Sequence, residues 1–155
     1  MLKYVSFDIV FQEIPDEVTL AINLSLCPNR CPGCHSPHLR GDVGDQLTPE
    51  RLAVLIDDYR SAITCVCFMG GDGDQAEVAR LARMVKTDYG KRSAWYSGCD
   101  ALPDQFDPTA FDYVKIGRYD AAFGPLKEPT TNQRLYRIAN GEMTDITSRF
   151  WKKSL

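Results

Sequence analysis

The stretch TPERLAVLIDDYRSAITCVCFMGGDGDQAEVARLARMVKTDYG, residues 48–90, decides the fold. Thr48 is a suitable N-cap, and Pro49 suits the first position of a helix because no N–H needs a partner there. Apolar residues then recur at helical spacing and predict one buried face: Leu52, Leu55, Ile56 and Tyr59. The mostly apolar residues 62–69 are typical of a buried strand, and a pair of glycines ends it. The stretch therefore begins with a helix and a strand.

A second helix is predicted in the remainder of this stretch. Asp74 and Glu77 stand at the spacing of a capping box, with Asp74 in the capping role, and Gly90 fits the helix end. The apolar residues between them share one face: Val78, Leu81, Ala82 and Val85. Residues 93–96 and 111–116 are predicted strands that follow. Alternating strands and helices are typical of parallel βαβ units, which indicates an α/β fold.

Upstream of this stretch, the sequence predicts an N-terminal β-hairpin. Residues 4–11 and 18–26 contain β-branched and aromatic residues, and residues 14–17 supply a turn between them. Downstream, residues 103–108 are predicted to form a loop or a short helix, and the chain after Gly117 is predicted to be irregular.

Length and composition restrict the class of protein. The chain has 155 residues, which predicts a single domain, residues 1–155, with a core of its own. The net charge of -3 gives no overall positive field for nucleic acid, so no nucleic-acid partner is expected. Asp8 interrupts the apolar N-terminus, and no apolar run approaches the roughly 20 residues of a membrane helix. We therefore expect a cytoplasmic protein without a membrane partner.

Half of the six cysteines lie in one short segment, Cys27-Pro-Asn-Arg-Cys31-Pro-Gly-Cys34-His35. Iron–sulfur clusters are held by cysteine thiolates, usually four, and this C-x3-C-x2-C segment supplies three. Three thiolates leave one iron without a protein ligand, and an open metal position is what a catalytic site needs. The alternative is a structural zinc site completed by His35 or His38, but no second C-x2-C pair follows.

The other distinctive segments also follow predicted strands. Gly70-Gly71-Asp72-Gly73-Asp74 follows residues 62–69, Ser97-Gly98 follows residues 93–96, and Gly117-Arg118 follows residues 111–116. Ligands of parallel α/β proteins bind at the carboxyl ends of strands. We therefore expect these loops to gather around one site with the cysteine segment.

A C-x3-C-x2-C loop in this place resembles the radical S-adenosylmethionine superfamily. The resemblance implies a partial, incomplete parallel (β/α) barrel behind the N-terminal hairpin, with a [4Fe-4S] cluster on Cys27, Cys31 and Cys34. It also implies S-adenosyl-L-methionine as cofactor, whose amino and carboxylate groups chelate the fourth iron. In that family a 5′-deoxyadenosyl radical then abstracts hydrogen from the substrate, and no catalytic residue is assigned here beyond cluster and cofactor.

The Gly70-Gly71-Asp72 segment resembles the Gly-Gly-Glu segment with which that superfamily holds the methionine amino group. Glycine lets the backbone approach a ligand, and a carboxylate suits an ammonium group. Asp72 has a shorter side chain than the glutamate of that superfamily, so its carboxylate reaches less far. Gly73 stands where the family often has proline. The alternative is a strand-to-helix turn without a ligand. The predicted cofactor-binding residues are Gly70, Gly71, Asp72, His35 and Ser97.

Three segments resemble the activating proteins of anaerobic ribonucleotide reductase: residues 31–35, residues 111–117 and Thr131-Asn132-Gln133-Arg134-Leu135. His35 departs from the tyrosine usual there. The resemblance implies abstraction of a hydrogen atom from a glycine Cα of the reductase large subunit. It further implies a low-potential electron donor such as flavodoxin or ferredoxin. A barrel left incomplete by the short chain would expose a lateral opening for the glycine loop.

Three alternatives remain open at this point. The chain could act on a small molecule, act on another glycyl-radical enzyme of the formate-lyase type, or be a non-enzymatic metal-binding or electron-carrier module. Cys65 and Cys67 share one strand face and are predicted to pack in the core. Cys99 follows a strand near the expected site, and its role stays open between a core or bystander position and a role beside the substrate or in redox chemistry.

Overall fold

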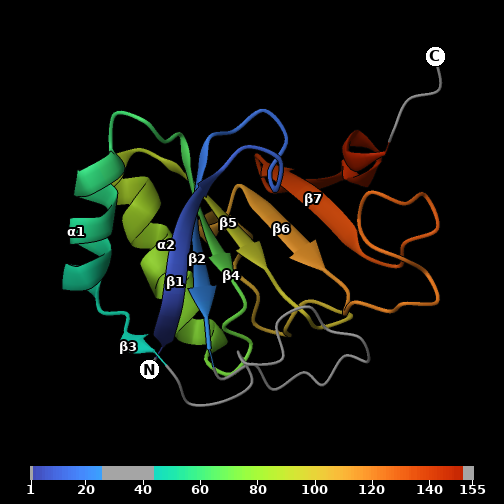
Figure 1. Cartoon of the computed structure of the whole chain (residues 1–155), viewed down its shortest axis with the longest axis horizontal. Coiled ribbons are helices and arrows are strands. Elements are labelled where there is room, and N and C mark those ends of the chain that lie inside the picture. Colours follow the sequence, from blue (N-terminus) through green and yellow to red (C-terminus); the bar gives the residue numbers. More distant parts are fainter. Residues whose placement is uncertain (1, 26–43, 152–155) are drawn as a thin grey trace.

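The computed structural model describes residues 2–25 and 44–151 (Figure 1). Within these residues, eight strands form one mixed sheet in the order β3-β1-β2-β4-β5-β6-β7-β8. The elements are β1 (Lys3–Val10), β2 (Thr19–Leu24), β3 (Asp45–Gln46), α1 (Pro49–Tyr59), β4 (Cys65–Met69), α2 (Gln75–Tyr89), β5 (Arg92–Tyr96), η2 (Pro108–Ala110), β6 (Tyr113–Ile116), β7 (Arg134–Ala139), β8 (Glu142–Asp145) and η3 (Thr147–Phe150).

The centre of the sheet is parallel. Strands β2, β4, β5 and β6 run side by side in the same direction, with α1 and α2 in two of the connections between them. Strand β1 pairs antiparallel with β2, as the hairpin prediction requires. The described residues therefore form a mixed α/β sheet, while closure into a partial barrel stays a prediction.

The capping signals explain where both long helices begin and end. The Thr48 hydroxyl accepts a hydrogen bond from the backbone N–H of Arg51 at 3.1 Å, and Asp74 accepts one from Glu77 at 3.4 Å. Gly90 ends α2 in the left-handed region, with φ of 63°. Each cap supplies an acceptor or a conformation that the helix end otherwise lacks. Both helices thus lie where the sequence predicted them.

One face of the sheet carries the main core. Figure 1 shows α1 and α2 together on one side of the strands. The predicted apolar helix faces pack there against alternate strand residues, and the members of this core include Leu20, Ile22, Leu52, Leu55, Ile56, Val66, Phe68, Val78, Leu81, Val85, Trp95 and Val114. Burial of these side chains is the dominant stabilising contribution to the fold.

The opposite face carries a smaller core that no long helix among the described residues covers. Cys65 and Cys67 are fully buried there, beside Tyr113 and Leu135. Ile14, from the turn after β1, is fully buried against them, and Phe150 of η3 packs at the edge. The predicted core role of both cysteines is confirmed, and the N-terminal turn and the C-terminal segment cover this face.

The prediction of an irregular chain after Gly117 was wrong. Strand β7 pairs antiparallel with β6, and β8 returns along β7. The Asn140-Gly141 dipeptide joins them with both residues at positive φ, 53° and 80°, which is the conformation of a tight hairpin turn. Strand β3 was not predicted either. The predicted loop or short helix at residues 103–108 is a turn at residues 104–105 that leads into η2, which begins at Pro108.

Candidate functional site

The loops that leave β4, β5 and β6 are hydrogen-bonded to one another at the carboxyl edge of the sheet. The Gly70 N–H donates to the carbonyl of Tyr96 at 2.9 Å, and the Ser97 N–H donates to the carbonyl of Lys115 at 2.8 Å. The Gly117 N–H donates to the carbonyl of Cys99 at 2.7 Å. Three segments predicted to share one site therefore do lie together, and we call this set of loops the carboxyl rim.

Gly70 and Gly71 form a turn that needs glycine at both positions. Their φ angles are 102° and 85°, where side chains are strained. A Cβ on Gly71 would lie 2.6 Å from Val78 Cγ2 and 2.9 Å from Leu24 Cδ1, whereas one on Gly70 would meet nothing closer than the Leu24 carbonyl at 3.6 Å. Gly71 therefore lets α2 pack on β2, and Gly70 places its backbone beside the end of β2.

Asp72 joins the loop after β4 to the loop after β5. Its Oδ1 accepts a hydrogen bond from the Ser97 hydroxyl at 2.5 Å, and its Oδ2 accepts one from the Gly98 N–H at 2.9 Å. The Ser97 oxygen in turn accepts from the Cys99 N–H at 3.0 Å. Ser97 is buried, so the pair is a fixed part of the rim. Sequence analysis predicted both residues for the site but not their contact.

The same residues are compatible with the ammonium group of S-adenosylmethionine. A carboxylate offers about four acceptor positions, so its bonds to Ser97 and Gly98 leave the chemistry of a cation ligand intact. The Gly70 carbonyl accepts from Trp95 Nε1 at 2.7 Å, which fixes the orientation of this peptide at the rim. These acceptor groups fit an ammonium ligand. Asp72 also has a structural role, because it joins two loops, and the turn interpretation alone did not include this role.

A buried lysine at the end of β6 was missed by sequence analysis. Lys115 is only 7% exposed, and its Nζ donates to the Gly117 carbonyl at 3.0 Å and to Gln133 Oε1 at 2.9 Å. The ammonium also lies 5.5 Å from the centre of the Tyr96 ring, within cation–π range. The available signal was a lysine inside a strand otherwise predicted to be buried. It places a positive charge beside the carboxyl rim on the face opposite the helices.

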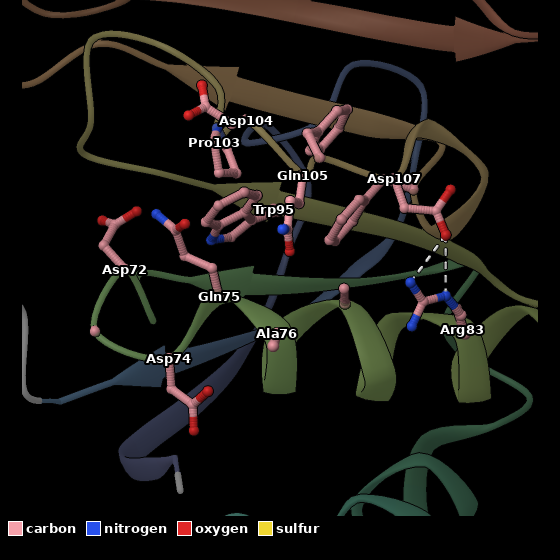
Figure 2. Close-up of a pocket in the computed structure, with 14 residues that line it drawn as sticks. Asp72, Asp74, Gln75, Ala76, Arg83, Trp95, Pro103, Asp104, Gln105 and Asp107 are labelled. Carbon is pink, nitrogen blue, oxygen red and sulfur yellow. Dashed lines mark hydrogen bonds and ion pairs between the residues drawn. The ribbon is translucent and has the colours of Figure 1, made fainter.

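A hollow of about 710 Å³ lies between α2 and residues 103–107 on the helix side of the sheet. Figure 2 shows Asp72 and Gln75 at one end of it, beside Trp95, and the ion pair of Arg83 with Asp107 at the other. Hydrogen bonds from Thr109 and then from Arg83 lower the pKa of Asp107 to about 2. This hollow adjoins the rim through Asp72.

A second hollow, of about 600 Å³, lies on the opposite face above Tyr96 and Gln133. The Tyr96 hydroxyl donates to the Glu13 carbonyl, and burial raises the pKa of this phenol well above its ordinary value. The turn after β1 is thereby tied to the end of β5. In the described part of the chain, a hollow thus lies beside the carboxyl rim on each face of the sheet.

The predicted cluster ligands Cys27, Cys31 and Cys34 lie outside the described residues, as do His35 and His38. Among residues 2–25 and 44–151, no group of three or more histidine, cysteine or acidic residues could hold a metal ion. Burial raises the pKa of the Cys65 thiol and that of the Cys67 thiol, which opposes the thiolate form that binds metal. The described residues therefore offer no competing metal site.

The family model described as a 4Fe-4S single cluster domain matches residues 18–106. The match covers more than half of the chain and includes the three-cysteine segment, the Gly70-Gly71-Asp72 turn and Ser97. The chain belongs to this family. It is an iron–sulfur protein, and membership in the single-cluster family supports a 4Fe-4S cluster over the zinc site that the sequence left open.

Other comparisons add no relatives. No curated protein and no solved structure matches this single-cluster protein. In the described part of the chain, the helices are too short or too polar to span a bilayer.

Proposed function

We propose that this single-cluster protein is a radical S-adenosylmethionine activase whose [4Fe-4S] cluster is held by Cys27, Cys31 and Cys34. The observation that carries the proposal is the contact between Gly70 and the end of β2. A Cβ on Gly70 would lie 3.6 Å from the Leu24 carbonyl, so the turn predicted to hold the cofactor is packed beside the strand that leads into the cysteine segment.

The rim supplies the polar groups that such a cofactor requires. Asp72 and the Gly70 carbonyl suit the amino group of the methionine moiety, and Ser97 holds Asp72 in place at 2.5 Å. Lys115 lies on the other face of the sheet, where Gly117 and Gln133 accept its hydrogen bonds, so it stabilises the end of β6 and is not assigned to the cofactor. When bound to a reduced cluster, S-adenosylmethionine supplies the carbon-centred radical that takes a hydrogen atom. The proposed role of the rim residues is to bind and orient S-adenosylmethionine.

The proposed substrate is a glycine Cα of the large subunit of anaerobic ribonucleotide reductase. The likeness of residues 131–135 to that activase group supports a protein substrate. Gln133 of that segment is a partner of Lys115, so the segment contributes to the rim side of the sheet. A low-potential donor such as flavodoxin or ferredoxin would reduce the cluster.

The test mixes anaerobically reconstituted, reduced protein with S-adenosylmethionine and the reductase from the same organism. A doublet glycyl signal in electron paramagnetic resonance should form in step with 5′-deoxyadenosine. Cys31→Ala should abolish both products, while Cys65→Ala, a matched cysteine substitution in the core, should retain both. Cofactor cleavage without any glycyl signal would contradict the proposed substrate.

A small-molecule substrate is the second candidate, and one observation favours it. The hollow above Tyr96 measures about 600 Å³, which lies within the range of small-ligand pockets. An enzyme of this kind would cleave its cofactor rapidly with a small substrate and without a protein partner. The glycyl signal on the reductase would then be absent, so the same experiment separates the two candidates.

A further inference from the structure

Trp95 lies on the helix side of β5 and reaches the carboxyl rim with its side chain. It is only 1% exposed and belongs to the main core. Its Nε1–H nevertheless donates a hydrogen bond of 2.7 Å to the carbonyl of Gly70, at the start of the turn assigned to the cofactor. Figure 2 shows the indole at the same end of the helix-side hollow as Asp72, another residue of this turn. Trp95 thus joins the core to the proposed cofactor site.

Aromatic stacking holds the indole in one plane. The Trp95 ring stacks on Phe111 with the ring centroids 5.7 Å apart and 23° between the planes. Phe111 in turn stacks on Phe106, with the centroids 5.7 Å apart and 5° between the planes. Rings packed in this way in a dense core have few alternative rotamers. The direction of the indole N–H is therefore set by the core and does not depend on a ligand.

The peptide that receives this bond joins Gly70 to Gly71. Rotation of a peptide between two glycines meets little steric resistance, because glycine adopts positive and negative φ with similar ease. The Gly70 N–H is held by the Tyr96 carbonyl at 2.9 Å, but this N–H belongs to the preceding peptide. Among the described residues, the hydrogen bond to the Gly70 carbonyl comes from the indole. The indole bond therefore selects one orientation of the Gly70–Gly71 peptide.

This orientation decides which polar group the peptide offers to a cation. A carbonyl oxygen has two lone pairs, so the bond from Trp95 leaves one acceptor position on Gly70 for an ammonium group. Rotation of the peptide by half a turn would present the Gly71 N–H in place of that oxygen. An ammonium group only donates hydrogen bonds, so it gains nothing from an N–H. A turn without the indole bond should therefore bind the cation less often.

We propose that Trp95 is a positioning residue for the cofactor, whose indole N–H holds the Gly70 carbonyl in the orientation that accepts from the ammonium group of S-adenosylmethionine. This inference rests on the proposed function and deepens it, because it explains how the core prepares the Gly70-Gly71-Asp72 turn. Loss of the bond lowers the fraction of molecules whose turn is competent to bind. The apparent Kd then rises by the inverse of that fraction.

The test compares the same substitution at both tryptophans of the chain in the reconstituted holoprotein. Trp95→Phe keeps an aromatic ring in the stack but removes the N–H that Gly70 accepts. Trp151→Phe is the matched control, because the buried Nε1 of Trp151 has no hydrogen-bond partner among the described residues. The change in the electron paramagnetic resonance spectrum of the reduced cluster is measured against the concentration of S-adenosylmethionine. Trp95→Phe should raise the apparent Kd about five- to tenfold, and Trp151→Phe should leave it unchanged.

Saturation separates positioning from support of the fold. At saturating S-adenosylmethionine, Trp95→Phe should reach the wild-type spectrum with the wild-type iron content, because the ligand draws the turn back to its competent orientation. The KM for S-adenosylmethionine in the release of 5′-deoxyadenosine should rise by the same factor as the Kd, with kcat unchanged. A wild-type Kd in Trp95→Phe would overturn the assignment. Iron loss, or a smaller spectral change at saturation, would also overturn it, since Trp95 would then support the fold alone.

A second variant preserves the shape of the indole. Both tryptophans are replaced by β-(3-benzothienyl)alanine, in which sulfur takes the place of the N–H. Because Trp151 makes no such bond among the described residues, this protein should show the same rise in Kd as Trp95→Phe. An unchanged Kd here would refute the role of the Trp95 N–H while the proposed function stands. A wild-type spectrum that does not respond to saturating S-adenosylmethionine would refute the proposed function itself, and the inference with it.

Discussion

Replacement of Asp72 by asparagine tests whether the carboxyl rim is held together as the structure describes. The carboxylate accepts from the Ser97 hydroxyl at 2.5 Å through one oxygen and from the Gly98 N–H at 2.9 Å through the other. An amide has one acceptor oxygen and presents a donor in place of the second. Asp72→Asn therefore costs one of the two bonds and the charge that strengthens both.

The expected loss follows from the strength of a hydrogen bond to a charged group, roughly 1.5–3 kcal/mol. Asp72 is half-buried, so we expect about 2 kcal/mol. For a chain of 155 residues, this corresponds to a fall in Tm of about 4–8 °C. Thermal unfolding of the reconstituted protein, followed anaerobically by circular dichroism, measures the fall. A change of less than about 1 °C would show that the Asp72 bonds do not hold the rim.

Ser97→Ala is the matched control for a role in cofactor binding. It removes the hydroxyl bond but keeps the carboxylate, so it should lower Tm and weaken the affinity for S-adenosylmethionine less than Asp72→Asn does, through the lost positioning of Asp72 alone. Asp72→Asn should weaken that affinity by roughly tenfold or more, since a charged hydrogen bond is worth about 1.5 kcal/mol or more. Equal affinities in the two variants would assign Asp72 to the turn alone.

Other substitutions test the core, the turn and the acid response. Cys65→Ala and Cys67→Ala should each lower the free energy of unfolding in urea by about 1–2 kcal/mol, because packing in the core is lost. Iron and sulfide content should stay at the wild-type level. Iron loss from folded protein would contradict the core role of these two cysteines. Gly71→Ala should lower the free energy of unfolding by about 3 kcal/mol or more, because its Cβ would meet two side chains within 3 Å at a φ of 85°. Gly90→Ala should lower it by about 1–2 kcal/mol, because its Cβ would meet nothing within 4 Å. The pKa of Asp107 is lowered to about 2, so the Asp107 carboxylate stabilises the fold above the ordinary pKa of 3.8, and this contribution is lost as pH falls toward 2. Asp107→Asn should remove this part of the acid dependence of the urea midpoint. An unchanged dependence of the midpoint on pH would show that the fold does not stabilise the carboxylate.

Local signals explain which parts of the fold could be predicted. Thr48 and Asp74 cap α1 and α2 through bonds within the first turn, and Gly90 ends α2, so a short window of sequence contains the whole cause. The β7–β8 hairpin was missed for a different reason. Strand β8 has the sequence Glu-Met-Thr-Asp, which shows no apolar alternation, and all four residues are exposed. Only Asn140-Gly141 marked the turn.

The sequence predicted that the loops of the carboxyl rim lie together, but not the contacts between them. Gly70, Asp72 and Ser97 were each placed at a strand end, which needs only the order of elements along the chain. The bond between Asp72 and Ser97 depends on the register that sets Met69 beside Tyr96, and a single sequence does not contain it.

Iron analysis and spectroscopy of the anaerobically reconstituted protein test the central claim most directly. The account predicts about one four-iron cluster per chain, lost in each of Cys27→Ala, Cys31→Ala and Cys34→Ala. It further predicts that S-adenosylmethionine changes the electron paramagnetic resonance spectrum of the reduced cluster, because three thiolates leave one iron open to a new ligand. Stoichiometric zinc without iron, or a four-iron cluster whose spectrum is unchanged by saturating S-adenosylmethionine, would contradict it.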